Sequence, residues 1–353
     1  MTNNLCQGLL NQGYQVDLLM VKCRGPHAKN IPEGVNTIKF KMNSTWLCLP
    51  ELIAYLWTEK PKVLLAAKHR GVALAVTAKA FTSAETKIIG QIHTNTSATF
   101  AQKNQRQREQ RFREMRKYYP QLNAIIGVSQ GVVDDIQQVI GQAMPKMAKA
   151  MPNALFDERI HLNAEQPVDH TWLNDRQHPV LMAAGRLTAQ KDFMTLVRAF
   201  ALANQQQPLR LIIIGEGEQK TALMQLAEEL GVESSLDFQP FQTNLPAWLA
   251  KADCFVCSSA WEGLGNVVAE SLAVGTPIVS TDCQSGPRDI LEDGALGPLV
   301  AVGDAEALGQ AILERLNADW PNYSQQAKAS AQRFHLDESA VQYLQFFKQV
   351  SEA

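Results

Sequence analysis

The stretch WEGLGNVVAE, residues 261–270, places two carboxylates eight residues apart, closely after the apolar run CFVCSS. Gly263 and Gly265 permit a tight loop that leaves backbone amides uncovered. A helix beginning near Asn266 would add the positive end of its dipole, which favours an anion or a sugar hydroxyl. From just over one turn into that helix, Glu270 could accept two hydrogen bonds from a vicinal diol such as ribose.

The first carboxylate, Glu262, lies in the loop itself. A simpler interpretation makes Glu262 a partner of the helix dipole and Glu270 a helix charge paired with a neighbour. The spacing alone leaves both interpretations open.

A second set of charged residues follows the apolar segment VLMAAG in the sequence AAGRLTAQKDF. Arg186 and Lys191 lie five residues apart in the loop before the next helix. Loops at the carboxyl ends of parallel strands face the binding crevice, where two fixed cations suit a diphosphate and Arg186 can bind it in bidentate fashion. The alternative is a pair of ordinary solvent-exposed loop cations.

The elements that must position these side chains alternate regularly from Val180 onward. Apolar strands such as VLMAAG and LRLIIIG are followed by amphipathic helices such as DFMTLVRAFALANQ and QKTALMQLAEELG, which is typical of a parallel sheet covered on both faces. The first half repeats the pattern with strands near YQVDLLMV, KVLLAA, TKIIGQIH and LNAIIGVS. We therefore predict an α/β fold with two doubly wound domains, 1–155 and 156–335, joined by an irregular segment near 152–178. We expect 336–353 to form a C-terminal helix that can pack back on the first domain.

The start of the chain departs from this pattern. A doubly wound domain begins with a strand and a glycine-rich turn, whereas MTNNLCQGLLNQG predicts a helix that ends at Gly13. We therefore expect the first domain, as given, to lack its first strand and glycine-rich loop, and our hypothesis is that the given start lies inside a longer natural reading frame.

Taken in order, these segments resemble the retaining group 1 glycosyltransferases of the GT-B fold. The resemblance covers nearly the whole chain and includes GRLTAQKDFMTLVRAFALA, LIIIGEGEQKTALMQLAEELG, WEGLGNVVAESLAVGTPIVSTDCQSGPRDIL, IIGVSQGV and MPNALF. It implies two Rossmann-like domains, with an E-x7-E motif at Glu262 and Glu270.

The resemblance assigns roles residue by residue. Arg186 and Lys191 match the pair that neutralises the donor diphosphate. Glu262 matches the acid that faces the transferred sugar, and Glu270 the acid that holds the nucleotide ribose. His93, after a strand of the first domain, matches a histidine that contacts the donor sugar, although an ordinary strand-end histidine fits equally well.

The predicted catalytic residues are therefore Glu262, Lys191, Arg186 and His93. The predicted substrate-binding residues are Glu270, Leu264, Gly265, Asn266, Val267 and Gly217. Gly217 lies in GEGEQ, which lacks the third glycine of a dinucleotide fingerprint. We expect no metal and no cofactor, because the two cations can carry the leaving-group charge and the nucleotide sugar is a substrate.

The implied reaction is transfer of a hexose or N-acetylhexosamine from a nucleotide sugar to a polysaccharide or lipid-linked saccharide, with retention of configuration. STDCQSGPRDIL is most similar to family members that build surface polysaccharide or lipid-linked oligosaccharide, which favours a UDP donor. Two alternatives remain open: a nucleotide-sugar epimerase of the same fold, and an inactive nucleotide-sugar binder without the first glycine loop.

Composition narrows the class of protein further. The 353 residues are 46% hydrophobic and 19% charged, and the net charge of −2 does not indicate nucleic-acid binding. No segment is apolar enough to span a bilayer, and six scattered cysteines suit a reducing cytoplasm. We interpret Cys254 and Cys257 as packing within a buried strand rather than as a metal or redox pair.

One segment of the first domain is strongly basic. Residues 102–121 hold seven Lys or Arg and two Glu, followed closely by Tyr118 and Tyr119 at the segment's end. Such a helix suits an anionic membrane surface, at the inner face of the plasma membrane, or else a solvated helix face. The sequence leaves these two interpretations open.

Overall fold

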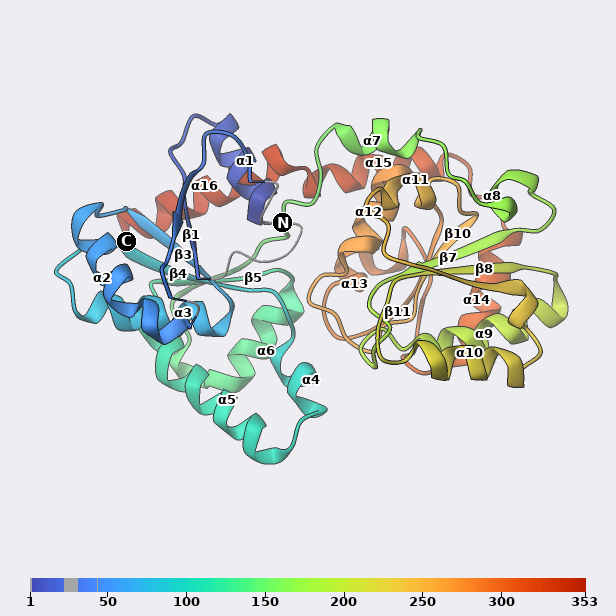
Figure 1. Cartoon of the computed structure of the whole chain (residues 1–353), viewed down its shortest axis with the longest axis horizontal. Coiled ribbons are helices and arrows are strands. Elements are labelled where there is room, and N and C mark those ends of the chain that lie inside the picture. Colours follow the sequence, from blue (N-terminus) through green and yellow to red (C-terminus); the bar gives the residue numbers. More distant parts are fainter. Residues whose placement is uncertain (1, 22–30, 43) are drawn as a thin grey trace. The chain divides into compact units, whose positions relative to one another are not determined.

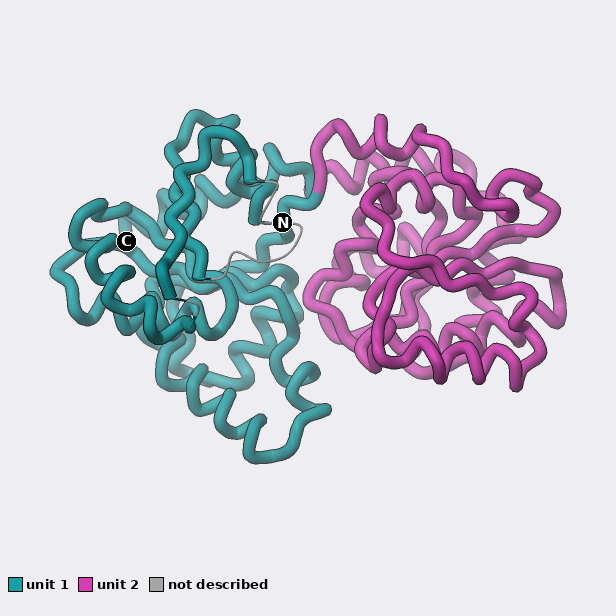
Figure 2. Tube along the Cα trace, in the orientation of Figure 1, with its two compact units in different colours: residues 1–155, 334–353 teal, residues 156–333 magenta. Residues whose placement is uncertain are grey.

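The computed structural model describes residues 2–21, 31–42 and 44–353. The chain divides into two compact units (Figure 2). Unit 1 joins Met1–Leu155 to Phe334–Ala353, and unit 2 is Phe156–Arg333. Both units are built on parallel strands connected by helices, so the predicted α/β class is confirmed.

Unit 2 contains one six-stranded sheet with the strand order β12-β11-β10-β7-β8-β9, and every neighbouring pair is parallel. Its strands are β7 (Val180–Ala184), β8 (Arg210–Ile214), β9 (Leu236–Gln239), β10 (Cys254–Cys257), β11 (Ile278–Thr281) and β12 (Leu299–Val300). β7 and β10 are buried along their whole length, which is why their sequences are continuously apolar rather than alternating. Cys254 and Cys257 thus pack inside a strand, as interpreted from the sequence.

Helices cover both faces of this sheet (Figure 1). α9, α10 and α14 form one layer, and α7, α11, α12 and α15 pack together in the other. The helices of unit 2 are α7 (Arg159–Ala164), α8 (Thr171–Asp175), α9 (Phe193–Gln206), α10 (Lys220–Glu229), α11 (Leu245–Leu249), α12 (Asn266–Val274), α13 (Pro287–Ile290), α14 (Ala305–Asn317) and α15 (Tyr323–Ala331).

The segment near 152–178 differs from the irregular linker that the sequence predicted, because it contains the short helices α7 and α8. Each of these helices buries a single residue, Ile160 in α7 and Leu173 in α8. Helices of five and six residues are too short for the periodic pattern from which a helix is predicted, which needs a window of about 11 to 18 residues.

Unit 1 contains a four-stranded parallel sheet with the order β3-β4-β5-β6 and a separate parallel pair, β1-β2. Its strands are β1 (Asp17–Met20), β2 (Asn36–Lys39), β3 (Val63–Ala67), β4 (Lys87–Ile92), β5 (Ala124–Gly127) and β6 (Met147–Ala150). Its helices are α1 (Thr2–Asn11), α2 (Leu49–Thr58), α3 (Lys68–Ala80), α4 (Thr96–Ala101), α5 (Gln105–Tyr118), α6 (Gln130–Ile140) and α16 (Leu336–Glu352).

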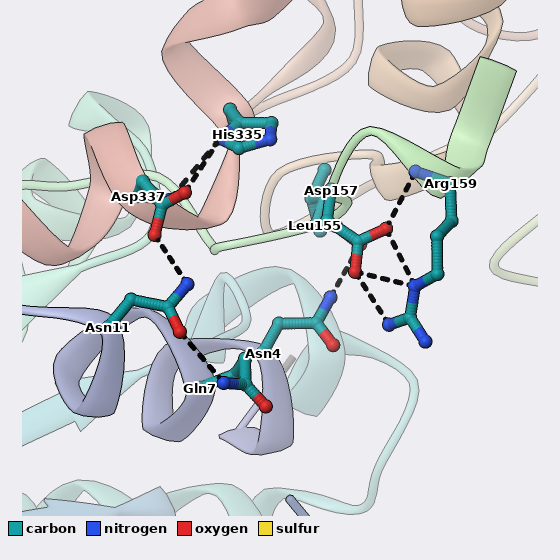
Figure 3. A network of polar contacts seen from close by, with 8 residues as sticks. All are labelled: Asn4, Gln7, Asn11, Leu155, Asp157, Arg159, His335 and Asp337. Carbon is teal, nitrogen blue, oxygen red and sulfur yellow. Dashed lines mark hydrogen bonds and ion pairs between the residues drawn. The ribbon is translucent and has the colours of Figure 1, made fainter.

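The last helix, α16, packs against α1 within unit 1. Gly8 allows the close approach, because a Cβ there would lie 2.5 Å from the carbonyl oxygen of Leu336. Polar contacts reinforce the packing: the Asn11 amide donates to Asp337 at 2.9 Å, and the Asn4 amide donates to the carbonyl of Leu155 at 2.6 Å (Figure 3).

Candidate functional site

The predicted site residues of unit 2 gather where the strand order of the sheet reverses. From β7 the chain continues to β8 and β9 on one side, whereas β10, β11 and β12 add on the other side. In open α/β sheets, this switch point opens a crevice at the carboxyl ends of the strands. The loop after β7 carries Arg186 and Lys191, and the loop after β10 carries Glu262. Two segments that are far apart in sequence therefore meet at one edge.

Glycines shape the loop after β7. A Cβ on Gly185 would lie 2.8 Å from the side chain of Lys191, so the lysine stem packs directly over this glycine. A Cβ on Gly215, which follows β8, would lie 1.9 Å from the carbonyl oxygen of Gly185. Only glycine allows these two backbones to touch, and the contact fixes the path along which Lys191 enters the crevice.

The centre of the site is an ion pair. Lys191 Nζ lies 2.5 Å from Glu262 Oε1, and the two side chains are only 20% and 7% exposed. The hydroxyl of Ser259 donates to the same carboxylate oxygen at 2.7 Å. Burial opposes the charge on Lys191, but the adjacent Glu262 carboxylate holds the pKa of the lysine above its usual value. Lys191 thus keeps its positive charge at neutral pH, and the carboxylate that it contacts is held from two sides, by Lys191 and by Ser259.

Further hydrogen bonds connect the two loops. The amide of Gln190 donates to the carbonyl of Trp261 at 3.1 Å, and the backbone N–H of Ala260 donates to the carbonyl of Gln190 at 2.8 Å. The hydroxyl of Ser258 donates to the carbonyl of Lys191 at 2.8 Å. These bonds hold the lysine and the glutamate in register without involving either charged group.

The helix α12 begins beside this pair. Its N-cap residue, Gly265, has φ +91° and offers no side chain to cap the helix, so the first amides keep their partial positive charge. A small cavity here is lined by Lys191, Ser259, Glu262, Gly265 and Val267, among others. An anion or a sugar hydroxyl in this position would meet the helix amides and the ion pair together.

Residues around α12 support its first turn. Leu264 is buried, and Asn266 is the first residue of the helix. A Cβ on Gly286, in the loop after β11, would lie 2.0 Å from the carbonyl oxygen of Leu264. The loop that carries Glu262 therefore rests directly on the backbone of the loop after β11.

Glu270 is the fifth residue of α12 and is half-buried. It forms no ion pair or hydrogen bond with any residue in the described part of the chain. Burial raises its pKa to about 7. The structure thus shows Glu270 in no ion pair with a neighbouring side chain of α12 within the described residues, and a half-buried carboxylate in this position is suited to binding a ligand hydroxyl.

The other two predicted residues of unit 2 have different surroundings. Arg186 is exposed, and within the described ranges it forms no ion pair, so its guanidinium can reach a ligand phosphate. Gly217 has a packing role, since a Cβ there would lie 2.3 Å from the carbonyl oxygen of Leu187.

His93 lies in unit 1, immediately after β4. Burial lowers the pKa of its imidazole to about 4, against the opposing effect of a hydrogen bond with Asn153. A neutral ring at pH 7 can donate one hydrogen bond and accept another. A second histidine at the same edge, His69, has its ring fixed by the Tyr119 hydroxyl and by Thr96 at 3.3 Å.

Two family models match the chain, one along each half. The model described as glycosyl transferases group 1 matches residues 169–334, and the model described as glycosyltransferase family 4 matches residues 1–153. The chain belongs to the group 1 glycosyltransferases.

Individual relatives of this group 1 glycosyltransferase agree with the assignment. A lipopolysaccharide core biosynthesis glycosyltransferase, LpsE of Rhizobium meliloti, is 42% identical over 40% of this chain and 40% of its own length. The N-acetylgalactosamine-N,N'-diacetylbacillosaminyl-diphospho-undecaprenol 4-alpha-N-acetylgalactosaminyltransferase of Campylobacter jejuni is 31% identical over 64% of this chain and 61% of its own length. The matches thus span less than two thirds of either relative.

Solved structures confirm the GT-B fold with two Rossmann-like domains. HepE of Anabaena, crystallised in complex with UDP, has a TM-score of 0.77 at 18% sequence identity, over 98% of this chain and 96% of that one.

Three residues of the site were not predicted from the sequence. Ser259 contacts Glu262, Gln190 connects the two loops, and Gly286 supports the loop after β10. Ser259 could have been suspected from its position three residues before Glu262. Nothing in the local sequence indicates the roles of Gln190 and Gly286, because their partners lie far away along the chain.

Proposed function

We propose that the chain transfers a hexosyl or N-acetylhexosaminyl group from a UDP-sugar to a polysaccharide or lipid-linked saccharide, with retention of anomeric configuration. The observation that carries the proposal is the Lys191–Glu262 pair beside the uncapped N-terminus of α12. A fixed cation and the positive end of a helix dipole suit a reaction in which negative charge develops on a departing diphosphate.

Each residue has a distinct proposed role. Arg186 and the amides of α12 bind the diphosphate, and Lys191 adds positive charge while it orients Glu262. Glu262 faces the transferred sugar, and Glu270 accepts hydrogen bonds from the ribose hydroxyls. Removing one such stabilising group typically raises the reaction barrier by about 3 kcal/mol. The role of His93 in contacting the donor sugar stays a prediction from the sequence resemblance.

Relatives support the choice of donor and acceptor. HepE was crystallised with UDP and, in another crystal, with UDP-glucose. The Campylobacter jejuni relative is named for transfer to a diphospho-undecaprenol-linked saccharide. We extend both properties to this chain as a UDP-sugar donor and a lipid-linked or polymeric saccharide acceptor.

We also propose that transfer needs no metal, because Arg186 and Lys191 supply the positive charge that a bound cation supplies in other transferases. Transfer should continue in the presence of a chelator. Loss of transfer on adding the chelator, with recovery on adding a divalent cation, would overturn this part of the proposal.

The first experiment is a thermal-shift series with UDP, GDP and ADP, followed by transfer assays with UDP-sugars and lipid-linked saccharides. We expect UDP to stabilise the protein most and UDP release to require an acceptor. Preferential stabilisation by GDP or ADP would refute the UDP donor. Conversion of a UDP-sugar to its epimer without an acceptor would instead identify an epimerase.

No helix in the described ranges is both long enough and apolar enough to cross a bilayer. We propose a cytoplasmic protein whose basic segment, residues 102–121, contacts an anionic membrane surface at the inner face of the plasma membrane. No role in nucleic-acid binding is proposed.

A further inference from the structure

The loop that carries His93 is short and is joined to fixed structure at both ends. On one side, the carbonyl of Ile92 at the end of β4 accepts a hydrogen bond from the backbone N–H of Val128 at 3.1 Å. On the other side, α4 begins at Thr96, which is buried. Only residues 93–95 connect the strand to the helix. The position of the imidazole therefore depends on what holds the first turn of α4.

A buried carboxylate from a neighbouring helix holds this first turn. Asp135 lies on α6, which packs against α4 (Figure 1), and is only 4% exposed. Its carboxylate accepts hydrogen bonds from the backbone N–H of Thr96 at 2.7 Å and from that of Ser97 at 3.2 Å. The side chain of Asn95 accepts from the backbone N–H of Ala98 at 2.9 Å. Side chains of the protein thus satisfy the first three amides of α4, which the helix itself leaves without partners.

The start of α4 therefore differs from the start of α12. In α12 the N-cap residue is Gly265, which has no side chain to offer, and the first turn borders a small cavity. In α4 the carboxylate of Asp135 already occupies the position in which an anion would bind to a helix N-terminus. We infer from this contrast that Asp135 fixes the backbone after β4 and leaves ligand contact to the residues of the loop.

A second buried network holds the side chain of Thr96. Its hydroxyl lies 3.3 Å from Nε2 of His69, at the start of α3, and Nδ1 of the same ring contacts the hydroxyl of Tyr119. Burial lowers the pKa of His69 to about 4, so at pH 7 the ring is neutral and carries one donor and one acceptor nitrogen. Tyr119, in the short helix η3 (Tyr119–Gln121), is 1% exposed. The ring of His69 thus connects a fully buried tyrosine to the first residue of α4.

We propose that Asp135 is a positioning residue for the transfer reaction, because it holds His93 in place through the first turn of α4. The contacts of His69 and Tyr119 with Thr96 support the same turn from the side of α3. The inference rests on the proposed function, since it takes His93 as the residue that contacts the donor sugar.

The first experiment uses Asp135→Asn, which keeps the size of the side chain. An amide has one acceptor oxygen and turns its NH₂ group toward the second backbone donor, so one N–H of α4 loses its partner. We expect kcat to fall between about tenfold and 100-fold, as is typical when a group in the site is slightly displaced. The Kd for UDP should stay the same, because the proposed UDP site lies in unit 2.

A double-mutant cycle with His93→Ala shows whether Asp135 acts through the histidine. In a chain that already lacks the imidazole, D135N should lower kcat by no more than about twofold. An unchanged kcat in D135N alone, or effects of D135N and H93A that multiply in full, would overturn the inference. A loss of kcat in D135N when H93A alone has no effect would overturn it as well.

Asp304 supplies a matched control. It also caps a helix, since it accepts from the backbone N–H of Ala307 at 2.9 Å, but it does so at the start of α14 in unit 2. Asp304→Asn should leave kcat unchanged, and a loss as large as that of D135N would overturn the inference. If D135N does not fold, Tyr119→Phe takes its place in the cycle, because it removes the hydroxyl that holds His69 and keeps the ring. An unchanged kcat in Y119F, or full additivity with H93A, would then overturn the inference.

A spectroscopic measurement tests the positioning of His93 without any substrate. Burial lowers the pKa of His93 to about 4, and the charge of Lys68 acts in the same direction. A loosened loop exposes the ring to water, so the pKa should rise toward 6.5 in D135N and stay near 4 in D304N. The measurement is an NMR titration of the imidazole resonance that is missing in H93A. An unchanged pKa in D135N would overturn the inference.

The inference and the proposed function can therefore fail separately. A chain that transfers no sugar, but in which D135N raises the pKa of His93, refutes the transferase proposal and leaves the positioning of His93 by Asp135 intact. A chain that transfers sugar, and in which D135N and H93A have fully additive effects on kcat, refutes the positioning role alone.

Discussion

Removal of Lys191 should destabilise unit 2 as well as impair catalysis. The substitution Lys191→Met retains most of the side-chain volume but leaves the Glu262 carboxylate, 7% exposed, without its cation. Breaking a buried ion pair from one side costs about 3–5 kcal/mol, since the remaining charge stays desolvated. In a unit of about 180 residues, each kcal/mol lowers the melting temperature by about 2–4 °C. The expected loss is therefore about 6–20 °C.

The double variant K191M/E262L separates the charge from the packing. Replacing both members of a buried pair with apolar residues is often neutral for stability. We expect the double variant to unfold at a higher temperature than K191M, even though it carries one more substitution. Both variants should bind UDP poorly, which distinguishes stability from activity.

The assay is thermal unfolding, which calorimetry monitors. UDP binding is measured on the same samples. Arg159, whose side chain is 78% exposed and pairs with Asp157, supplies a control. Arg159→Met removes a surface pair worth about 0–1 kcal/mol. The reasoning is refuted if K191M melts no lower than R159M, or if K191M/E262L loses as much stability as its two single substitutions added together.

Three further predictions concern the residues around the ion pair. Burial raises the pKa of Glu270 to about 7, so its carboxylate is largely protonated at pH 6 and ionised at pH 8. The affinity for a UDP-sugar should therefore rise about tenfold between these pH values. A wild-type affinity that does not change with pH, or the same pH dependence in Glu270→Gln, would contradict the role in ribose binding. Ser259→Ala removes a donor to the Glu262 carboxylate and should lower kcat about tenfold with little change in nucleotide Kd, as measured by turnover at saturating donor; an equal loss in Kd would indicate general damage. Gly286→Ala should weaken both UDP binding and thermal stability, because the new Cβ would collide with the backbone of Leu264. The control is Gly294→Ala, where φ is a similar +98° but the space is open, so the free energy of unfolding should fall by only about 1–2 kcal/mol. Similar melting temperatures for the two variants would show that the Gly286 contact is unimportant.

The elements of unit 2 could be predicted from the sequence because their local signals agree. β7, β8 and β10 are buried apolar runs, and α9 presents Phe193, Leu196, Val197 and Phe200 on one face. Glycines at the strand ends then indicate where the loops of a crevice begin. These signals lie within windows of about ten residues, which is the range over which periodicity and turn chemistry operate. The two short helices α7 and α8 were missed because five or six residues are too few for a periodic signal.

The pairing within the site could not be predicted in the same way. Lys191 and Glu262 are 71 positions apart, and the sequence presented them as one cation for a diphosphate and one acid for a sugar. Only the parallel register of β7 beside β10 brings the ends of these strands together, and that register depends on the complete sheet. Each charge also needs the other, because a buried charge without its partner is desolvated and nothing compensates the cost. The two residues therefore act as one unit. We expect the specificity of the site to depend on the residues that hold this ion pair in place, and Ser259 is the first of them to test.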